Sequence, residues 1–306
     1  ISESLLHRKI IRKHVLLGYM HASLAFGWFL LIVFGHVETY FYFKSMSNPV
    51  YIPIFFDYFV HDKAGMPFSR ILVMLMDLFL LFVLTGVFLA YYKRYKSKLF
   101  GMKKTTKLII GDKFALTALW FIFPLRLLAE TVTSGIHGSG GFMTRNLGEW
   151  LAYYFPLENF ELTAWWAYSI SLGVFFVALP FSRYMHIPTE ILLIFFRWMG
   201  IKSKKEFDSF AKAELYSCSS CGICIDSCQL SSLGINKNTP SAYFLKSVRR
   251  NKISEEDMFN CLLCGKCQKD CPVGITTTNH RIAQRAIFSD EDQGNFDYID
   301  PIFIHK

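Results

Sequence analysis

The chain has 306 residues, 52% of them hydrophobic and 17% aromatic, and a formal net charge of +9. A composition so apolar argues against an ordinary soluble protein, although the length allows two domains. The basic residues flank long apolar segments, so we expect them at a membrane surface and predict no nucleic-acid partner. No secretory signal with a cleavage site is visible.

Four apolar segments are long enough to cross a bilayer, which takes about 20 residues of helix. They cover residues 15–35, 71–92, 114–132 and 162–182. Basic residues gather before the first segment, after the fourth, and between the second and third, where residues 93–107 contain seven. Because positively charged loops stay in the cytoplasm, we predict a multi-pass protein of the inner (cytoplasmic) membrane with both ends of the bundle inside.

Two segments are expected to be loops at the outer face of the membrane. Residues 37–69 are aromatic and apolar, and residues 133–161 are Gly-rich and then aromatic. Such a composition suits the membrane interface, where Tyr and Trp are favoured. After the fourth span, the sequence IPTEILLIFFRWMG predicts an amphipathic helix along the membrane surface.

Charged residues inside the predicted spans are costly, so each invites a functional interpretation. Arg126 and Glu130 are four residues apart on one helix face and are spaced to pair with each other. Asp77 is the one acid of the second span, and a neighbouring helix could supply its partner. For all three residues a structural role and a quinone-binding role remain open.

Two histidines lie near the cytoplasmic ends of different spans, His21 in the first and His186 after the fourth. Two histidines at similar depth on separate helices are what a bis-histidine haem b requires. The alternative is that each forms a hydrogen bond to a neighbouring helix. His14, seven residues before His21 on the same face, is an alternative ligand or a headgroup residue beside Arg12 and Lys13.

Two further histidines are expected at the outer face. His36 lies fifteen residues beyond His21, which is about 22 Å along a helix. His137 follows the third predicted span on the same side. Together they could bind a quinone headgroup and take its protons, hold a second haem, or serve as interfacial polar residues.

All eight cysteines stand in two runs, CSSCGICIDSC at 218–228 and CLLCGKCQKDC at 261–271. Both runs have the spacing C-x2-C-x2-C-x3-C, which is typical of two [4Fe–4S] clusters. In two-cluster ferredoxins the fourth cysteine of each run binds the cluster of the other run. We therefore assign one cluster to Cys218, Cys221, Cys224 and Cys271, and the other to Cys261, Cys264, Cys267 and Cys228.

Zinc and disulfides are the rival interpretations of these cysteines. Zinc usually takes four ligands as two pairs, and disulfides belong to oxidising compartments. Two four-cysteine runs of identical spacing suit neither. Pro272 follows the second run as in ferredoxins, whereas Gln229 holds that place after the first run, which weakens the match but leaves every ligand position filled.

The 32 residues between Cys228 and Cys261 contain SAYFLKSVRR and SEEDMFN, which we expect to be helical. With the two cysteine runs, this stretch resembles the α-helical ferredoxin module of heterodisulfide reductase C subunits and of succinate dehydrogenase iron–sulfur subunits.

The segment PFSRYMHIP is similar to the last span of the gamma (cytochrome b) subunit of respiratory nitrate reductase. Three further segments resemble membrane-bound iron–sulfur reductases that fuse such a cytochrome to a heterodisulfide-reductase-type module: HRKIIRKHVLLGYMHASLAFGWFLL, DLFLLFVLTGVFLAYYKRY and GDKFALTALWFIFPLRLLAE. This resemblance implies an inner haem between His21 and His186. The outer haem of that family would need histidines where this chain has Leu31 and Tyr168, so we expect one haem b.

The sequence thus predicts an all-α membrane protein. A four-helix transmembrane cytochrome b bundle is expected over residues 1–200, a cytoplasmic α-helical ferredoxin domain over 201–290, and a C-terminal tail over 291–306. The expected function is respiratory electron transfer between membrane quinone, menaquinone by resemblance, and a cytoplasmic partner. The fused relatives continue into CCG domains that this sequence lacks, so we expect a separate catalytic subunit of the CCG-domain, flavin or hydrogenase type.

Two alternatives remain open. The chain could conduct electrons to a hydrogenase, a formate dehydrogenase or a flavoprotein without a quinone site of its own. It could also be a membrane redox sensor or scaffold whose clusters report rather than conduct. We expect no substrate other than quinone on this chain, and no residue is assigned to catalysis.

Overall fold

The computed structural model describes residues 8–44, 68–96, 99, 106–201, 209–234 and 239–293. Every regular element in these ranges is a helix, which confirms the predicted fold class. The chain forms two compact units: the membrane unit comprises Ile1–Gly101 and Lys107–Tyr184, and the C-terminal unit comprises Met102–Thr106 and Met185–Lys306. Most of the predicted outer loop at 37–69 and most of the tail at 291–306 lie outside the described residues.

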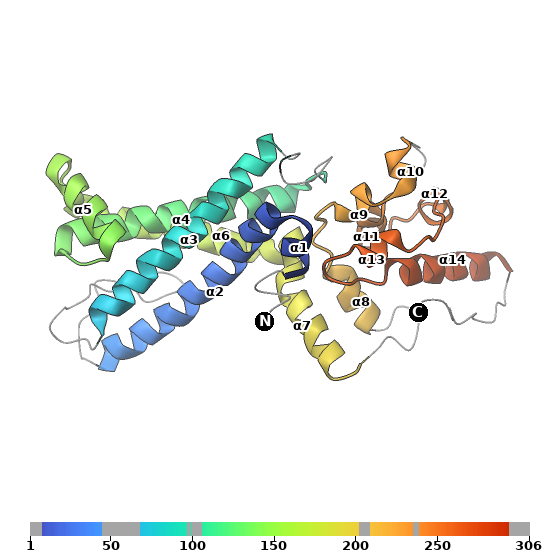
Figure 1. Cartoon of the computed structure of the whole chain (residues 1–306), viewed down its shortest axis with the longest axis horizontal. Helices are drawn as coiled ribbons and strands as arrows, with labels where there is room; N and C mark the ends of the chain where they lie inside the picture. The colour runs from blue at the N-terminus through green and yellow to red at the C-terminus, as the bar shows by residue number, and fades with distance from the viewer. Residues whose placement is uncertain are drawn as a thin grey trace. The chain divides into compact units, whose positions relative to one another are not determined.

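Among the described residues, four helices are long and apolar enough to cross a membrane, as predicted. These are α2 (Val15–Lys44), α3 (Ser69–Tyr95), α4 (Ile110–His137) and α6 (Glu161–Ala178). Figure 1 shows α2 against α3, with the short α1 (Arg8–Lys13) beside α2, and α4 along α6. The membrane unit is therefore built from two long helix pairs.

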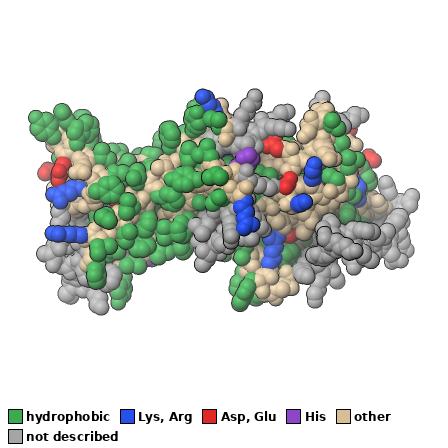
Figure 2. All heavy atoms as spheres, viewed as in Figure 1, with side chains coloured by type: hydrophobic (Ala, Val, Ile, Leu, Met, Phe, Trp, Pro, Cys, Tyr) green, Lys and Arg blue, Asp and Glu red, His purple; other side chains and the backbone are tan. Residues whose placement is uncertain are grey.

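The outer surfaces of these helices are apolar. Phe88, Phe114 and Val177 are 69%, 61% and 72% exposed. Figure 2 shows hydrophobic side chains covering much of the visible face of the helices of the membrane unit. Exposed side chains of this kind are expected where the surrounding solvent is lipid hydrocarbon, because a transmembrane helix bundle has no need to hide them.

The residues expected to form an outer loop at 133–161 contain a helix instead, α5 (Phe142–Tyr154), followed by the short η2 (Leu157–Asn159). The Asp77 carboxylate of α3 holds the first turn of α5. It accepts hydrogen bonds from the backbone N–H groups of Met143 and Thr144, at 2.7 and 3.1 Å, and from the Thr144 hydroxyl at 2.9 Å. A carboxylate at a helix N-terminus satisfies N–H groups that have no partner within the helix.

Two glycines set the close crossing of α5 and α4. A Cβ atom added at Gly135 would lie 2.5 Å from the Gly148 carbonyl oxygen, and one added at Gly148 would lie 2.6 Å from the Gly135 nitrogen. Neither position has room for a larger side chain. These two glycines reflect close packing of two helices, whereas Gly138 and Gly140, which have positive φ, lie in the turn between α4 and α5.

The start of α4 is joined to the turn after α6 through Asp112, a buried residue. Its carboxylate accepts hydrogen bonds from the backbone N–H groups of Arg183, at 2.7 Å, and Ile109, at 3.1 Å. That turn contains two short 3-10 helices, η3 (Leu179–Phe181) and η4 (Arg183–Met185). One buried acid thus fixes where α6 ends relative to the start of α4.

The C-terminal unit consists of short helices. The predicted amphipathic helix is α7 (His186–Trp198), and the two segments expected to be helical between the cysteine runs are α11 (Ser241–Arg249) and α12 (Glu255–Phe259). The remaining helices are α8 (Ser209–Tyr216), α9 (Ile223–Asp226), α10 (Gln229–Ser232), α13 (Lys266–Lys269) and α14 (Thr277–Gln293). A small apolar core includes Leu215, Phe244, Leu245, Met258 and Ile275.

Candidate metal centres

The two cysteine runs form loops with the same backbone conformation. The residue before the second cysteine has a positive φ in both, at 52° for Ser220 and 51° for Leu263. The glycine after that cysteine does so as well, at 92° for Gly222 and 70° for Gly265. Left-handed backbone turns the chain sharply, and glycine adopts it without steric cost. Each loop then enters a four-residue helix, α9 or α13, that carries the third cysteine.

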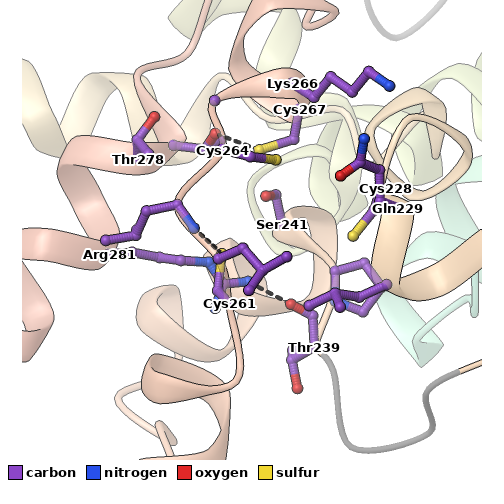
Figure 3. A pocket seen from close by; sticks show the side chains of 16 residues that line it. Cys228, Gln229, Thr239, Ser241, Cys261, Cys264, Lys266, Cys267, Thr278 and Arg281 are labelled. Carbon is purple, nitrogen blue, oxygen red and sulfur yellow. Dashed lines mark hydrogen bonds between the residues drawn. The ribbon is translucent and has the colours of Figure 1, made fainter. Parts of the chain in front are cut away.

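One cavity is lined by the first three cysteines of the second run and the last cysteine of the first run. These are Cys261, Cys264, Cys267 and Cys228. Figure 3 shows their sulfur atoms on different sides of the cavity, with Cys228 reaching it from its own loop. The structure therefore brings together the four residues that the exchange of fourth cysteines predicts for one cluster.

The other four cysteines also lie close to one another. Burial raises the pKa of the Cys224 thiol, and the neighbouring Cys221, Cys218 and Cys271 thiols raise it further. Burial likewise raises the pKa of Cys271 to about 11, with Cys221 and Cys218 contributing in the same direction. Buried thiols that share one site disfavour their anions until a cation compensates the charge, and a thiolate is the form that binds metal.

The donor set fits iron–sulfur clusters. In the described part of the chain, no three Cys, His, Asp or Glu side chains are close enough together to hold a single metal ion. Cubane ligands bind different iron atoms, so their sulfur atoms surround the cluster rather than meeting at one point. Each group of four thiols would hold one [4Fe–4S] cluster, which supplies one-electron redox chemistry.

Two hydrogen bonds reach sulfur atoms of the second loop. The Leu263 N–H donates to Cys261 Sγ at 3.4 Å, and the Thr277 hydroxyl lies 3.3 Å from Cys267 Sγ. Hydrogen bonds to ligating sulfur stabilise negative charge and so help to set the reduction potential of a cluster. Thr277 had no signal in the sequence, because a threonine ten residues after a cysteine is not part of any ligand spacing.

Comparison with known proteins adds an independent line of support. Residues 214–275 match the family described as the 4Fe-4S dicluster domain. These residues form an iron–sulfur domain of ferredoxin type. The match begins four residues before Cys218 and ends four residues after Cys271, so it contains both cysteine runs.

The iron–sulfur domain is also similar to a curated protein. A stretch of 69 residues is 33% identical to the C subunit of the ferredoxin/F(420)H(2)-dependent CoB-CoM heterodisulfide reductase of Methanosarcina acetivorans. That stretch is 22% of this chain and 41% of the relative, so the chain spans less than half the length of the protein it matches. No solved structure matches the chain.

Glu214, a buried residue of α8, is the centre of a group of polar contacts that involve α7, α14 and the segment after the second cysteine loop. Its carboxylate lies 3.2 Å from Arg197 of α7 and 3.2 Å from His280 of α14, and it accepts a hydrogen bond from the Thr276 hydroxyl. Burial alone would raise its pKa, but the bonds from His280 and Thr276, together with the charges of His280 and Arg197, lower the pKa of Glu214 below its ordinary value. Arg197 also donates to the carbonyl groups of Val273 and Gly274, directly after the second loop.

The predicted haem ligands belong to different compact units. His21 lies within α2 of the membrane unit, and His186 is the first residue of α7 in the C-terminal unit. Both side chains are half-buried. Leu31 and Tyr168, at the two positions where the nitrate reductase resemblance would place outer haem ligands, are buried in one apolar core.

The two outer histidines have partners within the membrane unit. His36 is exposed on α2, and its Nδ1 lies 2.8 Å from the Ile32 carbonyl oxygen of the same helix. His137 ends α4, and its Nε2 lies 3.3 Å from Glu161 at the start of α6. Glu161 also accepts a hydrogen bond from the Thr133 hydroxyl at 2.8 Å, and Thr133 in turn accepts one from Trp165. The sequence signal for Glu161 is an acid beside an apolar run.

Arg126 and Glu130 pair on α4 as their spacing predicted, with Arg126 Nε 2.7 Å from Glu130 Oε1. Asp77 finds its partner on α5, as described above. Neither observation supports a quinone site at these residues, because their charges are already compensated by neighbouring groups.

Proposed function

We propose that this chain is a membrane-anchored electron-transfer subunit that connects a membrane quinone with a redox partner in the cytoplasm. The observation that carries the proposal is the combination, on one chain, of an iron–sulfur domain and four helices able to span a membrane. Clusters held on a membrane anchor are suited to exchanging electrons with a carrier dissolved in that membrane. The eight cysteines hold two [4Fe–4S] clusters, with Cys228 and Cys271 exchanged between the runs.

In this proposal His21 and His186 hold one haem b between the quinone and the clusters. His21 lies half-buried within an apolar helix, where an ionisable residue is a functional candidate, and bis-histidine ligation uses both axial positions of the iron. The protein sets the path of the electron by placing these centres and by tuning their environment.

The quinone headgroup binds at the outer end of the bundle, near His36 and His137. Support comes from the contact of His137 with Glu161, because a histidine beside a carboxylate can take up a proton from a quinol and pass it on. Quinol oxidation releases one proton with each electron, so a site of this kind needs such a group.

A separate subunit supplies the catalytic chemistry on the cytoplasmic side. The similar protein is named as the C subunit of a heterodisulfide reductase. By that analogy the iron–sulfur domain passes electrons to or from another chain rather than acting on a substrate itself. The basic flanks of the predicted spans favour a cytoplasmic position for the iron–sulfur domain.

The first test is the cofactor content of the purified full chain. We expect one haem b by the pyridine haemochrome spectrum and about eight non-haem iron atoms, as two [4Fe–4S] clusters contain. His21→Ala and His186→Ala should each lose the haem and keep the iron–sulfur absorbance, whereas His14→Ala should keep both. Full haem in both of the first two variants would refute the assigned ligands.

The second test concerns the quinone. A reduced menaquinone analogue should reduce the haem of the reconstituted chain, and His137→Gln should slow that reaction without lowering the haem content. Reduction of the haem by dithionite, but never by quinols, would favour a conduit without a quinone site. A chain without haem would leave an iron–sulfur protein on a membrane anchor.

A further inference from the structure

Arg281 of α14 lies at the wall of the cavity that Cys228, Cys261, Cys264 and Cys267 surround. Its side chain is only 2% exposed, although a guanidinium group is charged at any physiological pH. Figure 3 shows the Arg281 side chain passing beside Cys261 to reach Thr239. A buried cation therefore stands next to the predicted ligands of one cluster.

The contacts of Arg281 hold its position without cancelling its charge. Two of its nitrogen atoms donate hydrogen bonds to backbone carbonyl groups, those of Asp257 and Thr239. The guanidinium carbon lies 4.3 Å from the centre of the Phe244 ring. Its Nε is buried and has no hydrogen-bond partner. Carbonyl dipoles and an aromatic face orient a guanidinium group, but neither neutralises it.

A buried charge is costly unless an opposite charge lies near it. The thiols of Cys261 and Cys267 are close enough to act electrostatically on Arg281 and act more strongly than the Arg285 guanidinium and the Asp257 carboxylate, whose effects have opposite signs. A cubane with four thiolate ligands carries net negative charge, and one-electron reduction adds one more. A fixed positive charge beside it stabilises the reduced form more than the oxidised form, and the low dielectric of the interior strengthens that difference.

We propose that Arg281 raises the reduction potential of the cluster bound by Cys228, Cys261, Cys264 and Cys267. The inference rests on the ligand assignment in the proposed function. In the step concerned, one electron enters the cluster from a donor such as dithionite, and no bond forms or breaks. Arg281 acts on the potential through its charge and is not a ligand.

Arg285, one turn further along α14, provides a matched comparison. It donates hydrogen bonds to the carbonyl groups of Met258, Phe259 and Cys261, so it also supports the second loop. Unlike Arg281, it does not line the cavity. Removing either arginine deletes one positive charge and at least one hydrogen bond to a backbone carbonyl group of α12, but only Arg281 lines the cavity.

The experiment is a redox titration of the full chain in detergent, followed by electron paramagnetic resonance, with iron content measured in parallel. Arg281→Gln should lower the ratio of reduced to oxidised cluster at a fixed solution potential at least tenfold, which corresponds to about 59 mV for one electron. Only one of the two clusters should shift, so the other serves as an internal reference. Arg281→Lys, which keeps the charge, should shift the ratio less than threefold, and Arg285→Gln should shift it less than Arg281→Gln.

Unchanged potentials in an iron-replete Arg281→Gln protein would overturn the proposal, as would equal shifts in Arg281→Gln and Arg285→Gln. If Arg281→Gln does not retain the cluster, Arg281→Lys is the test, because lysine keeps the positive charge. A tenfold lower ratio of reduced to oxidised cluster in Arg281→Lys would overturn the proposal, since it would show that the geometry of the side chain matters rather than its charge. A wild-type chain with far fewer than about eight iron atoms would instead contradict the ligand assignment. The failure of the proposed function is thus distinguishable from the failure of this inference.

Discussion

The two cysteine loops share a backbone conformation but lie in different surroundings. The first loop begins at Cys218, which is buried in the apolar core beside Phe244. The second loop reaches the surface, with Cys264 exposed and Leu262 65% exposed. The spacing of the ligands therefore determines the backbone conformation of each loop. The reduction potential of a cluster depends instead on the residues that the rest of the chain packs around it.

The largest expected effect tests how far the two loops are independent. Cys228→Ser removes a cysteine of the first run, yet it should abolish the cluster of the second run, because Cys228 lines that cavity. Iron content should fall from about eight atoms to about four. Cys264→Ser should lose the same electron paramagnetic resonance signal, and Cys221→Ser the other one. If Cys228→Ser and Cys221→Ser lose the same signal, the exchange is wrong.

The next largest effect concerns Glu214, whose partner Arg197 also holds the segment directly after the second loop. Glu214→Gln should destabilise the iron–sulfur domain by about 3 kcal/mol near neutral pH, the lower end for breaking a buried ion pair, because Arg197 is partly exposed. The measurement is the midpoint temperature of cluster loss, followed by visible absorbance. Glu149→Gln, which removes an exposed ion pair with Arg145, is the control and should change the midpoint little.

The same residue predicts a dependence on acid. The pKa of Glu214 is lower in the folded chain than its ordinary value, so its contribution is complete above the unfolded value of about 4.3. That contribution is lost as the pH falls through the folded pKa. Wild type should therefore approach the Glu214→Gln variant in stability below about pH 4. A constant difference between the two proteins across this range would argue against the contacts of Glu214.

A smaller effect tests the direct connection between the loops. The Ser227 hydroxyl donates to the Asp270 carboxylate at 2.6 Å, and each residue directly precedes the last cysteine of its run. Removing one partner of a hydrogen bond to a charged group costs about 1.5–3 kcal/mol. Asp270→Ala and Ser227→Ala should each lower the midpoint temperature, and the double variant should lose less than the sum. Additive losses would show that the two side chains do not interact.

The smallest effect concerns the backbone shared by the two loops. Gly265 has a φ of 70° and open space where a Cβ atom would lie, so Gly265→Ala meets no clash. Its cost should be at least the left-handed strain, about 1–2 kcal/mol, because Gly265 also lines the cavity. Lys269→Ala, at an exposed position of α13 that does not line the cavity, is the control and should leave the midpoint unchanged. An equally stable Gly265→Ala protein would mean that the loop has another conformation.

The sequence predicted the four long apolar helices and the grouping of the cysteines, because each leaves a pattern in the sequence. Apolar length identified four helices long and apolar enough to span a membrane, and the two-cluster ferredoxin pattern grouped Cys228 with the first three cysteines of the second run, which line one cavity. The positive φ of Ser220 and Leu263 was not predictable from their residue types, because the left-handed region disfavours both. Both residues stand at the same place in runs of identical spacing, so the conformation belongs to the loop rather than to the residue type.

Other features failed to appear in the sequence because they depend on contacts between distant segments. The helix α5 lies in a segment that was expected as an outer loop from its Gly-rich and aromatic composition, and only the packing shows that Gly148 lies against Gly135. Folding buries Arg281 and Glu214, two charged residues that had no signal in the sequence. A charged residue that is buried only through tertiary contacts leaves no pattern in the local sequence, so the spacing of residues along the chain cannot identify it.

The position of Cys228 among the cysteines of the second run also bears on how the domain matures. If each cluster needs a cysteine from both runs, neither can be completed while the other run is out of place. Iron insertion is then cooperative. The first cluster to form holds the two loops together, which reduces the entropic cost of ordering the ligands of the second cluster. The wild-type domain should therefore pass from empty to fully loaded with few half-filled chains, whereas a variant that lacks one ligand should stop at about four iron atoms.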